Sequence, residues 1–251
     1  MAGVKFHPGS RRDEPDARDR RFRPSIARLP RAVDLSAWCG EVYQQRHIQS
    51  CSANALASTF TLIANRDRRP IPGPSRLFMY FNARKAKRQQ QTDCGTTLRT
   101  AIKAAARFGA CPERMWRYLD ANVLATPPHP CYAHAHVRPA SYRRIARNLD
   151  DLYAALAQRN PFVFGVEAYV ETFSEAAHTG VLRLPRPSDR PITGHALICV
   201  GYDRAKKRFL ARNSLGKRFA DDGFFWIPEA YFIDRSLTFD FWIVSAIATE
   251  D

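Results

Sequence analysis

Two polar residues near position 50 have the types and spacing of a thiol-based reaction site. Cys51 stands at the start of an apolar stretch with helical spacing, and Gln45 precedes it by six residues. A cysteine at the N-terminal end of a helix lies at the positive end of the helix dipole, which favours the nucleophilic thiolate. A glutamine amide can donate a hydrogen bond to the oxygen of an acyl group under attack. The segment therefore predicts a nucleophile and an oxyanion donor.

Two downstream residues supply the remaining parts of such a site. His195 lies in a Thr-Gly-His-Ala-Leu run, and Asn213 lies in an Arg-Asn-Ser-Leu-Gly run. A histidine can act as the base, and an asparagine amide can fix the tautomer and orientation of the imidazole. A single cysteine before a helix is usually a small buried apolar residue. Here four complementary residue types occur in a workable order, which favours catalysis over a structural role.

The runs around these residues resemble those of the papain-like cysteine peptidases, in their bacterial branch. The nucleophile stands in Ser-Cys-Ser-Ala-Asn-Ala over residues 50–55, and His195 follows Cys51 by 144 residues, within the family's spacing of about 130–150. Asn213 follows His195 by 18 residues. The resemblance extends from about Leu29 to about Ala248. It implies an α+β fold with a helical lobe, an antiparallel β-sheet or half-barrel lobe, and the active site between them.

The resemblance also assigns roles. Cys51 would be the nucleophile, His195 the base and Asn213 its orienting partner, while Gln45 and the Cys51 backbone N–H would form the oxyanion hole. Substrate-binding positions would be Gly95, where an extended peptide pairs by backbone hydrogen bonds, Gly194 and Leu215. Gly95 reads equally well as an ordinary loop glycine before a helix. Leu215 replaces the tryptophan with which most family members shield the histidine–asparagine pair. No metal and no cofactor are implied.

The expected activity is that of a cysteine peptidase, which cleaves peptide or amide bonds through a thioester acyl-enzyme. An alternative keeps the same residues but changes the acceptor, giving an amidase, a transpeptidase or an acyl-transfer enzyme of biosynthesis or effector type. A non-catalytic use of the fold is disfavoured because all four roles are filled. Arg46 and Gln49 replace the usual small residues before the nucleophile, so they would either crowd the nearby subsites or select an acidic or polar group.

Composition sets further bounds. The 251-residue chain has a net charge of +15 and 45% hydrophobic residues, enough for one large domain or two tightly packed lobes. The dispersed arginines without interleaved aromatic residues favour a solvated arginine-rich surface over a nucleic-acid partner, while an acidic peptide or protein substrate stays open. No apolar run is long enough to span a membrane, and the N-terminus lacks the apolar region of a signal peptide. A cytoplasmic chain is expected, with export by a non-Sec route still open; the oligomeric state is not encoded in any recognisable pattern.

The six cysteines do not form an obvious disulfide framework. With Cys51 as nucleophile an odd number remains. Cys94 and Cys111 flank a predicted helix over residues 96–108, whose length of about 20 Å would keep the two thiols apart.

Residues 1–28 form a separate segment, a basic N-terminal arm or short pro-like segment ahead of a catalytic domain over 29–251. The domain would divide into a helical lobe over about 35–125 and a β lobe over about 126–251. The arm has few apolar residues, so its docking is expected to be weak or absent and the full-length chain is expected to be active. The competing hypothesis is that the arm crosses the groove by β-pairing and blocks it.

Periodicity and capping residues predict the elements that would position the site. The predicted helices are 51–65, 75–86, 95–108 ended by Gly109, and 150–158. The predicted strands are 162–168, 195–202, 208–212, 224–227 and 239–248, with a polar loop over 174–190.

Overall fold

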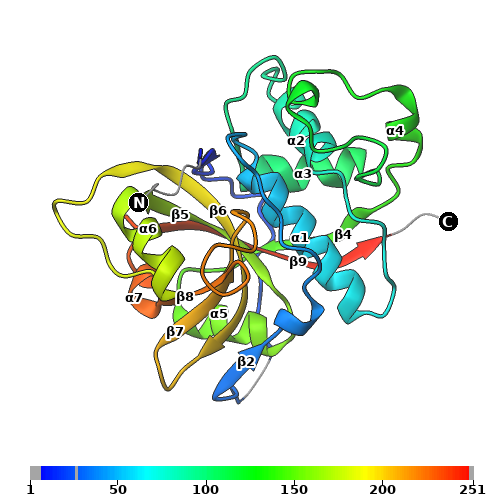
Figure 1. The fold of residues 1–251 in the computed structure, drawn as a ribbon. Coiled ribbons are helices and arrows are strands. Elements are labelled where there is room, and N and C mark those ends of the chain that lie inside the picture. The colour runs from blue at the N-terminus through cyan, green and yellow to red at the C-terminus, as the bar shows by residue number, and fades with distance from the viewer. Residues whose placement is uncertain (1–6, 26–27, 249–251) are drawn as a thin grey trace.

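A computed structural model describes residues 7–25 and 28–248. Helix α1 (Cys51–Arg66) runs through the middle of the molecule, between a lobe of helices and a large sheet (Figure 1). Nearly all of α1 is buried, because one side contacts the sheet strands β6 (Pro191–Asp203) and β9 (Thr238–Ala248) and another contacts helices. The N-terminal end of this helix therefore lies at the junction of the two lobes.

The sheet is antiparallel throughout. Its order is β4-β9-β5-β6-β7-β8, with β2 added beside β6. The strands not yet bounded are β2 (Ala32–Asp34), β4 (Arg138–Arg144), β5 (Phe162–Tyr169), β7 (Arg208–Arg212) and β8 (Phe224–Pro228). Helices and an antiparallel sheet in one chain confirm the α+β class.

Helices α2 (Arg76–Lys85) and α3 (Leu98–Phe108) pack beside α1 to make the helical lobe, with the short α4 (His129–Ala133) at its edge. Both longer helices have side-chain caps, because Ser75 accepts from the Phe78 N–H and Thr97 accepts from the Thr100 N–H. Gly109 ends α3 with a φ of 72°, a conformation that glycine adopts without strain. The remaining helices, α5 (Leu149–Ala157), α6 (Val170–Thr179) and α7 (Glu229–Ile233), accompany the sheet.

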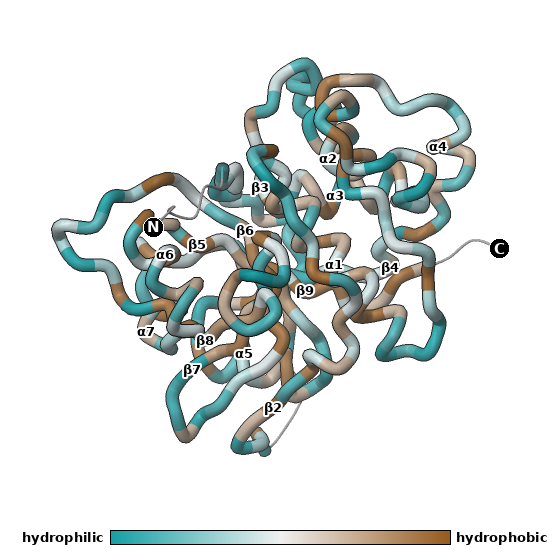
Figure 2. Tube along the Cα trace, in the orientation of Figure 1, coloured by the Kyte–Doolittle hydropathy of each residue, from teal (hydrophilic) through white to brown (hydrophobic). Residues whose placement is uncertain are grey.

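Aromatic side chains fill the core of the β lobe. Phe162, Phe164, Phe209, Phe232 and Phe241 are all buried, and the Phe209 and Phe232 ring centroids lie 4.3 Å apart. Figure 2 shows hydrophobic residues along α1 and the strands, and hydrophilic residues along the segment between α6 and β6. Burial of such rings stabilises the β lobe through the hydrophobic effect and ring packing.

The predicted elements are confirmed at most positions, with two corrections. The prediction of a loop over 174–190 is wrong for its first residues, because α6 continues to Thr179; Phe173 and Ala176 are buried three residues apart on its inner face. The third predicted helix begins at Leu98, because Gly95 has a φ of 69° and Thr96–Thr97 form strand β3. All six cysteines are free thiols. No helix among the described residues has the length and hydrophobicity to cross a membrane.

The expectation of weak or absent arm docking is also wrong for the described part of the arm. Strand β1 (Ser10–Arg11) pairs in parallel with β3, and the arm passes between the helical lobe and the sheet (Figure 1). Phe22 is buried and its N–H donates to the Arg144 carbonyl at 2.8 Å. The arm has few apolar residues, but charged and backbone groups provide the contacts that apolar side chains would otherwise make. Residues 1–6 and 26–27 of the arm lie outside the described residues.

Candidate active site

Cys51 is the first residue of α1, and its side chain is fully buried at the junction of the lobes. Its sulfur accepts a hydrogen bond from the Gly9 N–H at 3.4 Å and is also approached by the backbone N–H of Ala196. Burial raises the pKa of the thiol, and these N–H groups oppose the shift. In this buried position the neutral thiol is favoured over the thiolate that the helix position alone suggests.

His195 and Asn213 come together on the sheet side. His195 lies in β6, and its Nε2 is 2.9 Å from Asn213 Oδ1; this oxygen also accepts from the Ser214 N–H at 2.8 Å. Because the amide oxygen accepts, Nε2 carries the hydrogen, which leaves Nδ1 as the nitrogen able to take up a proton. Burial lowers the pKa of His195 to about 4, against the opposing effect of the Asn213 hydrogen bond. The edge of the Phe173 ring packs on the imidazole, with centroids 5.8 Å apart.

Gln45 is buried and its amide is held at both ends. Its Oε1 accepts from the Ser214 hydroxyl at 2.6 Å, and its Nε2 donates to the carbonyl oxygens of Ile48 and His7, both at 3.1 Å. The Tyr118 hydroxyl donates to the Gln45 carbonyl at 3.0 Å. Ser214 thus contacts both Gln45 and Asn213.

The arm lies where a substrate peptide would be expected. The Gly9 carbonyl accepts from the Thr96 N–H at 2.9 Å, and a Cβ on Gly95 would overlap that carbonyl. A Cβ on Gly194 would overlap the Ser10 carbonyl. Both glycines named in the sequence analysis therefore border an extended backbone, whose closest approaches leave no room for a side chain.

Leu215 occupies a different place from these glycines. It is 8% exposed and forms a bridge with Gln44, on the loop that carries Gln45. The ring that packs against His195 comes instead from Phe173 on α6. No helix is predicted from the sequence over residues 170–179, so the sequence gives no role to Phe173; the apolar spacing of Val170, Phe173 and Ala176 is the signal that indicates the helix. Ser214 carried no signal, since its role depends on contacts between lobes.

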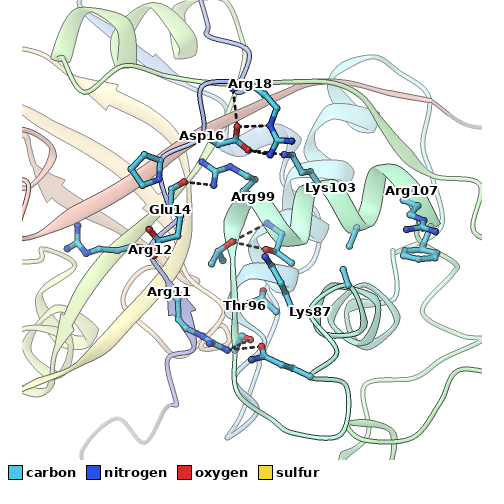
Figure 3. Close-up of a pocket in the computed structure, with 18 of the residues that line it drawn as sticks. Arg11, Arg12, Glu14, Asp16, Arg18, Lys87, Thr96, Arg99, Lys103 and Arg107 are labelled. Carbon is cyan, nitrogen blue, oxygen red and sulfur yellow. Dashed lines mark hydrogen bonds and ion pairs between the residues drawn. The ribbon is translucent and has the colours of Figure 1, made fainter.

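Further along, the arm is fixed by buried charges. Asp13 has a fully buried carboxylate that accepts from Trp242 Nε1 at 2.9 Å and from the Arg99 N–H at 3.1 Å. Arg99 on α3 also pairs with Asp19 at 2.6 Å. Figure 3 shows this face of the arm, where Arg99 and Lys103 of α3 reach toward the chain between Glu14 and Arg18. The arm is therefore held by charged groups that contact α3 and Trp242, in addition to its contact with Cys51.

No group of three or more histidine, cysteine, aspartate or glutamate residues suited to a metal ion occurs within 7–25 and 28–248. The chemistry that these residues can support is attack by the sulfur on a carbonyl, with Gln45 beside the developing oxyanion and His195 as proton carrier.

Comparison with known proteins identifies the family. A profile of papain family cysteine proteases matches residues 83–233. An uncharacterized peptidase C1-like protein of Acanthamoeba polyphaga mimivirus is 32% identical over 231 residues, which is 87% of this chain and 74% of that protein. The chain belongs to the papain family of cysteine proteases. The family resemblance predicted from the sequence is thereby confirmed, and with it the assignment to the cysteine-type peptidases.

Solved structures agree with a papain-like fold. Xylellain, a cysteine protease from Xylella fastidiosa, superposes with a TM-score of 0.91 at 35% identity, over 100% of this chain and 99% of that chain. Digestive procathepsin L 3 of Tenebrio molitor larval midgut gives a TM-score of 0.71 at 14% identity, over 95% of this chain and 77% of that chain. The second likeness concerns the fold alone. A bacterial member of the papain family is thus similar to the whole of this chain.

Proposed function

We propose that this papain-family protein is a peptidase that cleaves peptide bonds through Cys51, His195 and Asn213, with a thioester acyl-enzyme. One observation carries the proposal: the groove already holds an extended peptide backbone, with the His7 carbonyl hydrogen-bonded to Gln45 and the Gly9 N–H on the Cys51 sulfur. A groove that accepts a backbone in this way is suited to a peptide substrate.

The reaction would use these groups in two stages. The thiol proton moves to His195 Nδ1, and the sulfur forms a bond to the carbonyl carbon while Gln45 and the Cys51 N–H stabilise the oxyanion. His195 then gives its proton to the leaving nitrogen, the C–N bond breaks, and a thioester remains. In the second stage His195 takes a proton from water, whose oxygen attacks the thioester; the C–S bond breaks, the acid is released, and the sulfur takes the proton back from His195. Asn213 keeps Nε2–H engaged throughout.

We further propose that the docked arm holds the enzyme in a latent state, the competing hypothesis of the sequence analysis. The arm fills the position of the attacked carbonyl, and its Gly9 covers the Cys51 sulfur, where burial favours the neutral thiol. Substrate would enter after the arm leaves the groove. Gly95 and Gly194, now beside the arm backbone, would then border the substrate backbone, and Leu215 would support the loop of the oxyanion donor from behind.

The test uses the full chain and a variant that cannot seat the arm. A Cβ on Gly9 would lie 2.5 Å from both the Cβ and the carbonyl oxygen of Gln49, so Gly9→Val should expel the arm from the groove. We expect an epoxide thiol probe to label Cys51 of this variant once per chain, and the variant to hydrolyse a peptide library. Cys51→Ser in the same background should lose both. Labelling of Cys94 or Cys111 ahead of Cys51, or hydrolysis without Cys51, would contradict the proposal.

A further inference from the structure

The side chain of Arg12 in the arm contacts four groups of the sheet side, which together we call the recess: the Phe239 ring, the Glu167 carboxylate and the carbonyls of Arg235 and Ser236. Its guanidinium carbon lies 4.5 Å from the ring centroid of Phe239, and its Nη2 lies 2.7 Å from a carboxylate oxygen of Glu167. The backbone carbonyls of Arg235 and Ser236 accept further hydrogen bonds from it, each at 3.1 Å. An aromatic face, a carboxylate and two carbonyls thus surround one cationic group.

This recess borders the reaction centre. Glu167 in β5 pairs with Gly194 in β6, and Gly194 directly precedes His195. A Cβ on Gly194 would lie 2.7 Å from the Phe239 ring and would overlap the Ser10 carbonyl of the arm. The recess therefore begins one residue from His195, beside the backbone path that a substrate would follow.

Two glycines keep the recess open. A side chain on Gly165 would overlap the Phe239 ring, and one on Gly194 would press against the edge of the same ring. Because both positions lack a Cβ, the ring can lie across the sheet as a floor between them. Arg12 leaves the arm toward this floor, while Arg11 diverges toward the turn that carries Gln89 (Figure 3).

We propose that the recess formed by Glu167, Phe239 and the carbonyls of Arg235 and Ser236 is a substrate subsite that selects an arginine side chain. The inference rests on the proposed function and names its substrate class. Arg12 then occupies the position that an arginine side chain of the substrate would take. A planar guanidinium can meet three acceptors and stack on the ring at once, whereas the compact ammonium of lysine cannot, so arginine is preferred to lysine.

The contacts within the recess, and not the net charge of the chain, determine which side chain the subsite prefers. The net charge of +15 favours acidic partners at a distance. Charges more than about 8 Å apart are largely screened in physiological salt, whereas Glu167 is in direct contact with the bound cation. The side chains of Arg12 and Glu167 are 45% and 28% exposed, so the ion pair alone contributes little and the ring and carbonyls add to it.

The experiment uses the full-length chain carrying Gly9→Val and Arg12→Ala, which removes the arm from the groove and empties the recess. Hydrolysis is measured on peptides in which each of the four residues on either side of the scissile bond is varied among arginine, lysine, leucine and glutamate. We expect one position at which kcat/KM for arginine exceeds that for leucine by about tenfold, with lysine between them. Adding Glu167→Gln should lower the arginine value about tenfold and leave the leucine value within about twofold.

Glu171→Gln is the matched control, because Glu171 is similarly exposed, at 32%, and pairs with Arg190 away from the recess. This substitution should leave kcat/KM unchanged for both the arginine and the leucine peptides. Equal turnover of arginine and leucine peptides at every position, or an equal loss for both with Glu167→Gln, would overturn the subsite while the leucine peptide still reports peptidase activity. Absence of hydrolysis of every peptide would overturn the proposed function and the subsite together.

Discussion

The side-chain amide of Gln45 donates a hydrogen bond to the backbone carbonyl of His7 at 3.1 Å, across 38 residues of sequence. The donor that a peptidase would use for the oxyanion is therefore engaged by the protein's own arm. Gly9, two residues on, meets the Cys51 sulfur, so the arm occupies the donor and the nucleophile together. A substrate bound by these two groups would compete with the arm for the same atoms.

Gly9→Val should make Cys51 far more reactive in the full-length chain. The added side chain cannot fit against Gln49, so the arm must leave the sulfur. Since Cys51 is fully buried in the docked state, we expect labelling by a thiol probe to accelerate by about 10²-fold or more, the scale on which a local opening of about 3 kcal/mol acts. Probe incorporation, followed by intact mass and peptide mapping, measures the change.

Gly73→Val is the control for this variant, because a Cβ at Gly73 meets nothing within 4 Å. It should label at the wild-type rate. If Gly9→Val labelled no faster than Gly73→Val, the arm would not limit access to Cys51.

The sequence predicted the elements that carry Cys51, His195 and Asn213 better than the surroundings in which these residues are held. Cys51, His195 and Asn213 lie where helix and strand periodicity placed them, because apolar spacing fixes which elements form the core. The sequence does not predict that the arm docks, because its anchor is Asp13. The buried Asp13 carboxylate accepts a hydrogen bond from Trp242, which lies more than 200 residues away in the sequence. Local patterns carry no information about such a contact.

Ser214→Ala should weaken catalysis by misplacing Gln45. The Ser214 hydroxyl donates to Gln45 Oε1 at 2.6 Å and so fixes which end of the amide faces the oxyanion. In the Gly9→Val background, Gln45→Ala should reduce kcat by about 10²–10³, as for the loss of one oxyanion donor. Ser214→Ala should reduce kcat less, with KM nearly unchanged. A change in KM alone would assign Ser214 to substrate binding.

His195→Ala and Asn213→Ala should differ in severity. His195 carries the proton, so its loss in the Gly9→Val background should abolish turnover. Asn213 only orients the imidazole, through the 2.9 Å contact at Nε2, so Asn213→Ala should retain partial activity. Steady-state hydrolysis by folded variants measures both. Equal loss from the two substitutions would mean that Asn213 does more than orient the base.

Opening the groove should move the pH dependence of Cys51 alkylation to lower pH. In the docked state burial raises the pKa of the thiol and lowers that of His195 to about 4, so between these values both groups are neutral. Water entering the groove reverses both shifts: the thiol pKa falls, the imidazole pKa rises, and a thiolate–imidazolium pair forms. Iodoacetamide labelling of Gly9→Val should thus persist into the acidic range, whereas wild-type labelling should require alkaline pH. Adding His195→Ala should return the pH profile of labelling toward that of an ordinary thiol. If the profile did not change, His195 would not be the group that stabilises the thiolate.

Asp13→Ala should loosen the arm and destabilise the chain. The Asp13 carboxylate is fully buried, accepts from Trp242 Nε1 and the Arg99 N–H, and lies 3.7 Å from Arg144. Its removal leaves a buried indole N–H and part of a buried charge network without an acceptor, at a cost of about 2–4 kcal/mol. We expect a lower urea midpoint and faster probe labelling of Cys51, since an arm released at its anchor also leaves the groove more often. Asp16→Ala is the comparison: that carboxylate pairs with the exposed Arg18 of the arm and lies 3.8 Å from Lys103 of α3, without the buried partners of Asp13, so its loss should change both measurements much less. If Asp13→Ala behaved like Asp16→Ala, the buried carboxylate would not be what holds the arm, and the groove contacts of His7 and Gly9 would have to hold it alone.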